Sequence, residues 1–423
     1  MHWRRYFRLF RLFLIVALFL LALAPEWPIF GDEAYQLRAI VSGSEFDFLT
    51  WETEAFLVKG EAILADAPQY LPEDTQKQIV LDFLALVADI QRLDAEIEKI
   101  YVDPAIDDPE VASAALQKNR VRKRAAMAEV QPVAEAIVQN QVGTILAEQG
   151  FGVWGQAWPP VMMHMTPLPT LLMVSPRDRI ERIHSYSLRV DLSTPEHEGV
   201  ETAVTNQLNL SALVVPIGGL GTYPAMIQET SNLNWFVEVV AHEWSHHWMS
   251  IFPVGYNYTV DVQVRSINET VAGTIDKEIA ALVIERYYPE FVPPPAPEPV
   301  DEPVAADPAI PPPFDFRAEM AQTRIEAERL LAEGEIDAAE MYMEARRRFF
   351  VDNGYAIRKL NQAFFAFYGA YQAEPGGAPG GDPIGPLVRD VRGNSSTLRK
   401  FMENMASVGN FADLEELAAE LNG

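Results

Sequence analysis

Residues 238–248 read EVVAHEWSHHW and place two histidines four residues apart, with a glutamate directly after the first. On an α-helix, residues i and i+4 lie one above the other on the same face. His242 and His246 can therefore turn two ring nitrogens toward one cation. Glu243 lies about 100° further around the helix, beside that cation without having to bind it. His247 points about 100° away from His246, so we do not expect it to bind the cation.

This arrangement is the HExxH pattern, in which two histidines bind zinc and the glutamate is the general base for a metal-activated water. Its surroundings favour a helix buried in a domain core, because the flanks WFVEVVA and WMSIF are apolar. TSN at 230–232 offers N-caps, and Pro253 ends the predicted helix. Buried histidine and acidic side chains need partners, and a metal ion is the natural one. The competing interpretation is an ordinary buried helix with two hydrogen-bonded histidines.

A third metal ligand is expected on a second predicted helix, SINETVAGTIDKEIAALVIERYY at 266–288. Glu269, near the start of this helix, is the preferred candidate on its spacing and helical context. Asp261, Asp276 and Glu278 remain alternatives. Three protein ligands would leave a fourth zinc position for water, as in catalytic zinc sites.

Asn268-Glu269-x-x-Ala272 resembles the NExxA segment of the gluzincin metallopeptidases, the superfamily of thermolysin and the aminopeptidases. The resemblance covers roughly residues 210–290 and implies a zincin-like catalytic domain with one Zn²⁺ per chain. By this resemblance the zinc ligands are His242, His246 and Glu269, and the general base is Glu243.

Two features depart from the family pattern. The spacing from the second histidine to the glutamate is a few residues longer than the commonest one, and Gly273 stands where thermolysin-like members have an aspartate that orients a histidine ligand. The family also implies a Tyr or His that stabilises the oxyanion after the glutamate helix. No histidine follows His247, so the candidates are Tyr355, Tyr368 and Tyr371, each of which is otherwise simple aromatic core.

Two further segments carry weaker signals. GGLGTYPAMIQET at 218–230 predicts an edge strand along which an extended peptide could lie. It faintly resembles the aminopeptidase strand in which a glutamate binds the free amine of the substrate, which would make Glu229 a substrate-binding residue; endopeptidase and aminopeptidase activity both stay open. MMHM at 162–165 holds soft ligands that suit copper, but methionine in a core strand is the preferred interpretation.

The composition is that of a globular protein of 423 residues with a formal net charge of −27. Such a field repels a phosphate backbone, so nucleic acid is not an expected partner. The absence of cysteine excludes disulfides and thiolate metal sites, which leaves imidazole and carboxylate as ligands.

The N-terminal segment indicates a membrane location. Four arginines precede an unbroken apolar run from Leu12 to Ala24, which has the length of a signal sequence. ALA at 22–24 looks like a cleavage site, but Pro25 would follow the cut. We therefore expect an uncleaved anchor at residues 1–25 with the rest of the chain outside the cytoplasm, or a secreted protein if the segment is removed.

The pattern along the chain predicts an α+β, mainly α fold. After the anchor, residues 26–150 are predicted to be helical with an antiparallel hairpin, 151–290 to form the catalytic domain with a small sheet, and 291–313 to be a Pro-rich acidic linker or insertion. Helices at 314–423 are expected to complete the catalytic cleft.

Together these features predict a membrane-anchored zinc metallopeptidase that hydrolyses peptides or proteins. The alternative belongs to another class: a membrane-tethered helical scaffold protein whose metal site is structural or vestigial. A site closed on all four positions would favour structural zinc.

Overall fold

The computed structural model describes residues 32–65, 70–102, 106–294, 314–368 and 384–422, together with Arg11 and Leu14. Apart from those two positions, the predicted anchor lies outside the described residues, and so does most of the predicted Pro-rich linker. No helix among the described residues is both long and apolar enough to span a membrane.

Two compact units divide the chain, Met1–Gly43 and Ser44–Gly423. In the first unit, helix α2 (Glu33–Val41) follows Asp32, whose side chain accepts a hydrogen bond from the Ala34 amide as an N-cap. The second unit holds every candidate site residue, and the fold that matters for function is therefore the fold of this unit.

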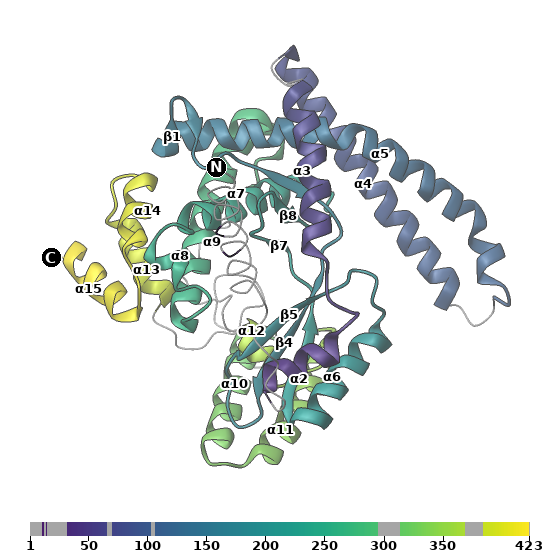
Figure 1. Ribbon diagram of the computed structural model, residues 1–423, viewed down its shortest axis with the longest axis vertical. Helices are drawn as coiled ribbons and strands as arrows, with labels where there is room; N and C mark the ends of the chain where they lie inside the picture. The colour runs from purple at the N-terminus through teal and green to yellow at the C-terminus, as the bar shows by residue number, and fades with distance from the viewer. Residues whose placement is uncertain are drawn as a thin grey trace, which may run out of the picture. The chain divides into compact units, whose positions relative to one another are not determined.

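The second unit is α+β and mainly helical, which confirms the predicted class (Figure 1). Its helices are α3 (Phe48–Ala65), α4 (Glu73–Val102), α5 (Pro109–Leu146), η2 (Ala147–Phe151), α6 (Thr194–Leu208), α7 (Leu233–Met249), α8 (Pro253–Tyr256), α9 (Val262–Tyr287), η3 (Pro289–Phe291), α10 (Phe316–Ala332), α11 (Ile336–Asp352), α12 (Gln362–Tyr368), α13 (Ile384–Gly393), α14 (Leu398–Ala406) and α15 (Phe411–Asn422). Its strands are β1 (Gly152–Val153), β2 (Gln156–Ala157), β3 (Met163–Met165), β4 (Thr170–Pro176), β5 (His184–Leu188), β6 (Leu210–Val215), β7 (Gly219–Leu220) and β8 (Ala225–Ile227).

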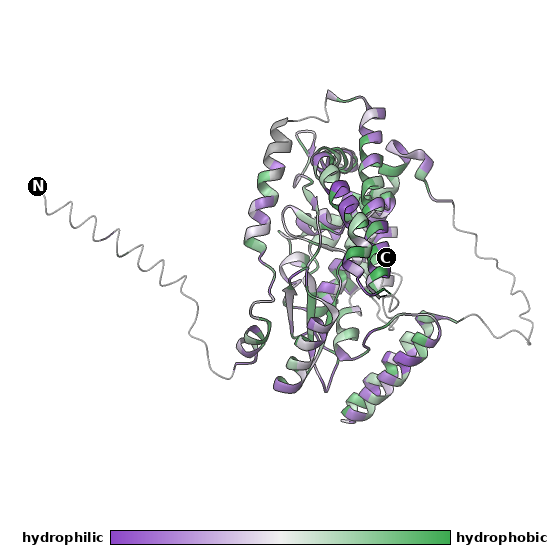
Figure 2. Cartoon of the chain, turned by 90° about the vertical axis from the view of Figure 1, so that its right-hand side faces the viewer, coloured by the Kyte–Doolittle hydropathy of each residue, from purple (hydrophilic) through white to green (hydrophobic). Residues whose placement is uncertain are grey.

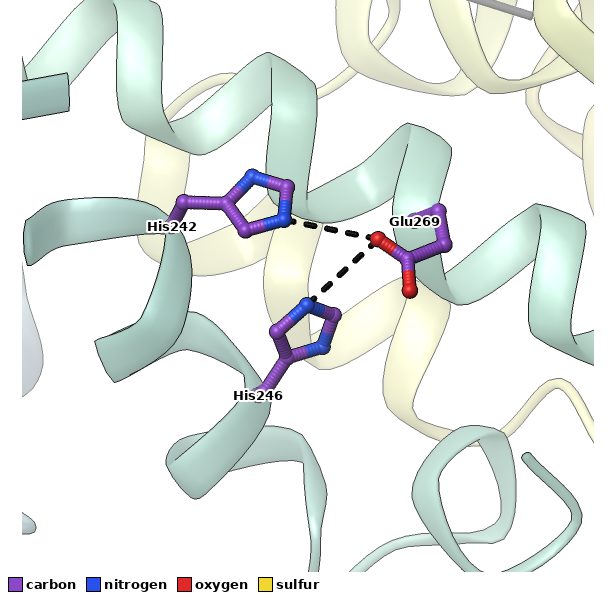
Figure 3. Close-up of side chains that lie close together, drawn as sticks. All are labelled: His242, His246 and Glu269. Carbon is purple, nitrogen blue, oxygen red and sulfur yellow. Dashed lines mark ion pairs between the residues drawn. The ribbon is translucent and has the colours of Figure 1, made fainter. Parts of the chain in front are cut away.

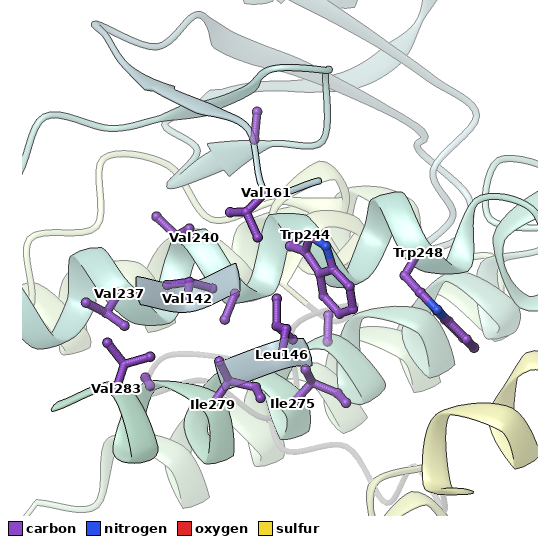
Figure 4. Packing of buried hydrophobic residues seen from close by; sticks show 14 of the residues in the cluster. Val142, Leu146, Val161, Val237, Val240, Trp244, Trp248, Ile275, Ile279 and Val283 are labelled. Carbon is purple, nitrogen blue, oxygen red and sulfur yellow. The ribbon is translucent and has the colours of Figure 1, made fainter. Parts of the chain in front are cut away.

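Helices α4 and α5 lie side by side as a hairpin, and they share one hydrophobic core with α7, α9 and the C-terminal helices α13 to α15 (Figure 1). Figure 2 shows hydrophobic and hydrophilic residues interspersed along the helices of the chain. Figure 4 shows α7 against α9, with α5 packed on both; the labelled residues are Val142, Leu146, Val161, Val237, Val240, Trp244, Trp248, Ile275, Ile279 and Val283. The predicted boundaries at 150 and 290 therefore fall inside one unit, since helices from both sides of each boundary build this core.

Besides the β1-β2 pair, two three-stranded sheets have different neighbours. In the first, β4 lies between β5 and β6 and pairs antiparallel with both. One face of this sheet packs on α10, α11 and α12 in a second hydrophobic core that includes Met173, Leu213, Met343 and Phe365. The other sheet has the order β3-β8-β7, with β3 parallel and β7 antiparallel to the central β8.

The two edges of the β3-β8-β7 sheet have different hydrogen-bond partners. On the β3 edge, three side chains of α5 bond to the strand backbone: Gln139 Oε1 accepts from the Met163 amide at 3.0 Å, Glu135 Oε1 accepts from the Met165 amide at 2.7 Å, and Gln131 Nε2 donates to the Met165 carbonyl at 2.6 Å. A closed edge cannot accept another strand. The opposite edge, β7, pairs with no further strand among the described residues and lies beside α7.

Candidate metal centre

Helices α7 and α9 pack side by side and bring the predicted ligands together. Asn232 caps α7 by accepting a hydrogen bond from the Trp235 amide at 3.1 Å, and Asp261 caps α9 through the Gln263 and Val264 amides. These caps fix where each helix begins and hence which residues face the neighbour. His242, His246 and Glu269 converge, with one possible ligand atom of each lying within 4.8 Å of the others.

The distances from Glu269 to the two histidines match those in a tetrahedral metal site. Glu269 Oε2 lies 3.4 Å from His242 Nε2 and 3.5 Å from His246 Nε2 (Figure 3). Two ligands at about 2.0–2.1 Å from a tetrahedral zinc ion are about 3.3–3.4 Å apart. The glutamate oxygen therefore stands at about the separation from each histidine nitrogen that such an ion requires.

Both histidines are held from behind by acceptors. His242 Nδ1 lies 2.9 Å from Asp276 Oδ2, and His246 Nδ1 lies 2.7 Å from Asn268 Oδ1. The Asn268 amide nitrogen donates to the Val254 carbonyl at 3.0 Å, which orients its oxygen toward the ring. Because both partners accept, each Nδ1 carries its proton, and the Nε2 lone pair is left to face the cluster. Partners of this kind orient histidine ligands in metal proteins.

The structure separates Glu269 from its sequence rivals. Asp261 is used as the cap of α9, and Asp276 lies behind His242. Glu278 forms a two-bond ion pair with Arg392, at 2.6 and 2.7 Å. Asp276 thus lies behind a histidine as the aspartate of the family pattern does, although Gly273 stands at that aspartate's place in the sequence. Asp276 can do so because it lies close to one helical turn beyond Gly273 on the same helix.

Glu243 is only 5 % exposed and lies beneath strand β7. A Cβ atom added to Gly219 would stand 2.1 Å from Glu243 Oε1, so any side chain at this point of the strand would displace the Glu243 carboxylate. Burial raises the pKa of Glu243, and the two nearby imidazoles only partly oppose it. A raised pKa makes this carboxyl a better proton acceptor than an exposed glutamate.

Charges within the cluster are strongly coupled. Burial alone would lower the pKa of His242, but the Asp276 and Glu269 carboxylates outweigh it and hold that pKa well above its usual value. The pKa of His246 is raised in the same way, mainly by Glu269. Burial would raise the pKa of Glu269, but the two imidazoles hold it well below its usual range. The carboxylates of the cluster therefore attract positive charge, either a proton on an imidazole or a metal ion in its place.

Tyr258 is a site residue that the sequence alone does not reveal. Its hydroxyl donates to Glu269 Oε1 at 2.5 Å, and its ring lies edge-on to His246 with centroids 6.0 Å apart. Arg265 fixes it from the other side, through its Nε and the Tyr258 carbonyl at 3.2 Å. The tyrosines predicted from the sequence all follow the glutamate helix, whereas Tyr258 precedes that helix in the chain.

The other predicted site residues lie elsewhere. Tyr355 stacks on Phe316 with ring centroids 4.4 Å apart, at the second hydrophobic core. Tyr368 belongs to that core too, and Tyr371 lies outside the described residues. The Glu229 carboxylate bonds to Arg124 of α5 at 2.9 Å. None of these contacts of Tyr355, Tyr368 and Glu229 reaches the cluster of His242, His246 and Glu269, so Tyr355 and Glu229 gain no support for their predicted roles.

Two further histidines also have other partners. His164 of the MMHM segment lies 3.2 Å from the Glu135 carboxylate, and its methionine neighbours Met163 and Met165 are buried. The Nε2 of His247 lies 2.6 Å from the Thr222 carbonyl, and burial lowers the pKa of this imidazole to about 4. His247 is thus turned away from the cluster of His242 and His246.

Compared with known protein families, curated proteins and solved structures, the chain shows no significant match. The geometry of the site is therefore the basis for assigning a function.

Proposed function

We propose that this protein is a zinc-dependent metallopeptidase with a zincin-like catalytic region. The observation that carries the proposal is the orientation of the ligands: His242, His246 and Glu269 present Nε2, Nε2 and Oε2 to one point, while both Nδ1 atoms are bonded to acceptors behind them. Two imidazoles and one carboxylate form a common ligand set of catalytic zinc sites.

Zinc bound here would supply Lewis acidity, polarising a substrate carbonyl and lowering the pKa of water. Three protein ligands leave one position open, which is typical of catalytic rather than structural zinc. The imidazoles of His242 and His246 retain 16 % and 17 % exposure, so the cluster is reachable from solvent.

Glu243 would accept the proton of the attacking water and then deliver it to the nitrogen of the leaving amine. The Glu243 carboxyl is buried and has a raised pKa, and both properties support this role. The Tyr258 hydroxyl, which donates to Glu269 Oε1, would have to turn from that carboxylate to the oxyanion to take the role predicted for Tyr355.

The open edge of the β3-β8-β7 sheet supports a peptide as the substrate. An extended chain can add to such an edge through backbone hydrogen bonds, largely independently of its side chains. Strand β7 lies directly over Glu243, so a chain placed along it would bring a peptide bond to the general base. The membrane anchor remains a prediction from the N-terminal sequence.

A comparison of two charge-matched variants tests the proposal. The full chain, loaded with zinc, is assayed on a quenched-fluorescence peptide library as wild type, Glu243→Gln and Glu285→Gln, the last an exposed glutamate of α9. We expect Glu243→Gln to keep its zinc and to lose about 10²–10⁴-fold in turnover, while Glu285→Gln behaves as wild type. Undiminished turnover in Glu243→Gln would refute the general-base role, and zinc binding without any turnover in the wild type would favour the scaffold alternative.

A further inference from the structure

The chain from Gly219 to Pro224, called here the covering segment, closes over the general base. A Cβ atom at Gly219 would overlap Glu243 Oε1, and one at Gly221 would lie 3.6 Å from both Glu243 Oε2 and the Cβ of His246. The position of this segment therefore limits where the Glu243 carboxylate can point. A shift of the segment by an ångström would change the geometry of proton transfer.

Pairing in the sheet holds the covering segment only at its start. Strand β7 pairs with β8 over two residue pairs, Gly219 with Ile227 and Leu220 with Met226. Beyond them the segment turns on local hydrogen bonds, with the Thr222 amide donating to the Leu220 carbonyl at 2.8 Å. So short a ladder is weak support for a segment that must stay in one place.

His247 provides a second attachment, from the helix that carries the metal ligands. Its Nε2 lies 2.6 Å from the carbonyl oxygen of Thr222, and its ring packs edge-on against Tyr223 with centroids 5.0 Å apart. The Tyr223 hydroxyl in turn donates to the Pro160 carbonyl at 3.1 Å. A carbonyl can only accept, so Nε2 is the protonated nitrogen of this ring.

The other nitrogen of the ring supports the same assignment. His247 Nδ1 is buried and has no hydrogen-bond partner among the described residues. Leaving a buried acceptor unpaired costs free energy, so the ring orientation has to be stabilised by what it gains at Thr222 and Tyr223. The same orientation removes His247 from the set of metal ligands.

We propose that His247 is a positioning residue, which fixes the covering segment to helix α7 and thereby holds Glu243 in its reactive orientation. This inference rests on the proposed peptidase function. The two consecutive histidines then have complementary tasks. His246 faces the cation, and His247 on the other side of the same turn holds the strand that covers the general base, so ligand and base are aligned by one rigid helix.

The test uses variants that separate the hydrogen bond from the ring. His247→Phe keeps an aromatic ring against Tyr223 and removes the donor, whereas His247→Gln can return a donor near the Nε2 position. His197→Phe is the matched control, because His197 is a partly buried histidine near Thr170 in another part of the unit. Gly219→Ala disturbs the contact with Glu243 directly.

Three quantities are measured on the zinc-loaded full chain: zinc content, amide hydrogen exchange over 219–227, and kcat and KM for a library peptide that the wild type cleaves. In His247→Phe we expect one zinc per chain, about tenfold faster exchange confined to 219–227, and a kcat lowered about tenfold or more with KM within about threefold. His247→Gln should restore exchange and kcat to within about threefold of wild type. Gly219→Ala should lower kcat in the same way, and His197→Phe should change neither the exchange over 219–227 nor kcat.

Unchanged exchange and kcat in His247→Phe would overturn the proposal, and so would a His247→Gln variant as impaired as His247→Phe. Loss of zinc in His247→Phe would also overturn it, because the residue would then act on the ligands. A wild type that binds zinc but cleaves no peptide would end the proposed function separately. The exchange pattern of the two His247 variants would then still decide whether the residue holds the covering segment.

Discussion

Two buried clusters in this protein combine histidine with glutamate, and they are built for opposite purposes. In the metal cluster, Glu269 faces His242 and His246. In the second, called here the Glu135 cluster, Glu135 of α5 faces Lys59 of α3 and His164 of β3. Both glutamates are buried, and both have a pKa below the usual range.

The difference lies in the donors. The Glu135 carboxylate receives hydrogen bonds from the Lys59 ammonium, from Gln131 Nε2 at 2.7 Å and from the Met165 amide at 2.7 Å, and His164 Nδ1 lies 3.2 Å away. Its lone pairs are satisfied by the protein. Glu269 receives one such bond, from Tyr258, and its other oxygen faces two Nε2 atoms whose rings carry their protons on the far side.

The comparison teaches that histidine and glutamate near one another do not define a metal site. What matters is where the N–H groups point. Asp276 and Asn268 draw the ring protons of the metal cluster outward, whereas Lys59 directs its protons into the Glu135 cluster. In our proposal one cluster is completed by a cation, whereas the other already contains the Lys59 ammonium.

Removing the charge of Glu135 should have the largest effect on stability. Glu135→Gln leaves the Lys59 ammonium buried without its counter-charge, and breaking a buried pair in this way costs about 3–5 kcal/mol of unfolding free energy. Chemical denaturation measures the loss. The paired variant Lys59→Met/Glu135→Gln should recover part of it, since no uncompensated charge remains. A loss below about 1 kcal/mol in Glu135→Gln would show that the ion pair does not hold α3 to α5.

Acid should break the two clusters at different pH values. Burial would raise the pKa of Glu135, but Lys59 and His164 together outweigh it and lower that pKa to about 2. The contribution of Glu135 to stability is therefore complete above the ordinary pKa of 4.5 and is lost as pH falls from there toward 2. The pKa values of His242 and His246 are raised, so these imidazoles take up protons at a higher pH than usual. A proton on either ring competes with zinc.

As pH falls below these raised pKa values, zinc affinity should therefore fall by about tenfold per pH unit for each imidazole that has taken up a proton, before the Glu135 cluster is affected. Competition with a chelating dye measures the first transition, and circular dichroism measures the second. Release of zinc only when the chain unfolds would contradict the separation of the two clusters.

Removing an orienting group should have a smaller effect. Asp276→Ala leaves His242 without its acceptor, and loss of such a partner costs about 10–100-fold in metal affinity. The same assay on Glu285→Ala, at an exposed position of α9, provides the baseline. Equal affinities in the two variants would mean that Asp276 does not orient the ligand.

The sequence predicts the local part of the site well. The i, i+4 pair on α7, the glutamate of α9 and the helical hairpin all follow from periodicity and motif spacing. Roles that depend on tertiary packing do not follow from the sequence. Asp276 acts only because α9 packs on α7, and Gly219 matters only because β7 crosses Glu243. Glu229 fits a sequence pattern, but Arg124, 105 residues away in the chain, determines its partner.

The central claim is that His242, His246 and Glu269 bind one zinc ion, and elemental mass spectrometry of the full chain tests it most directly. Wild type, Glu269→Ala and Glu278→Ala are reconstituted with zinc and dialysed side by side; Glu278 is the glutamate of the same helix that pairs with Arg392. We predict one zinc per chain in the wild type and in Glu278→Ala, and a greatly reduced content in Glu269→Ala. No zinc in the wild type, or equal zinc in both variants, would contradict the proposed metal centre.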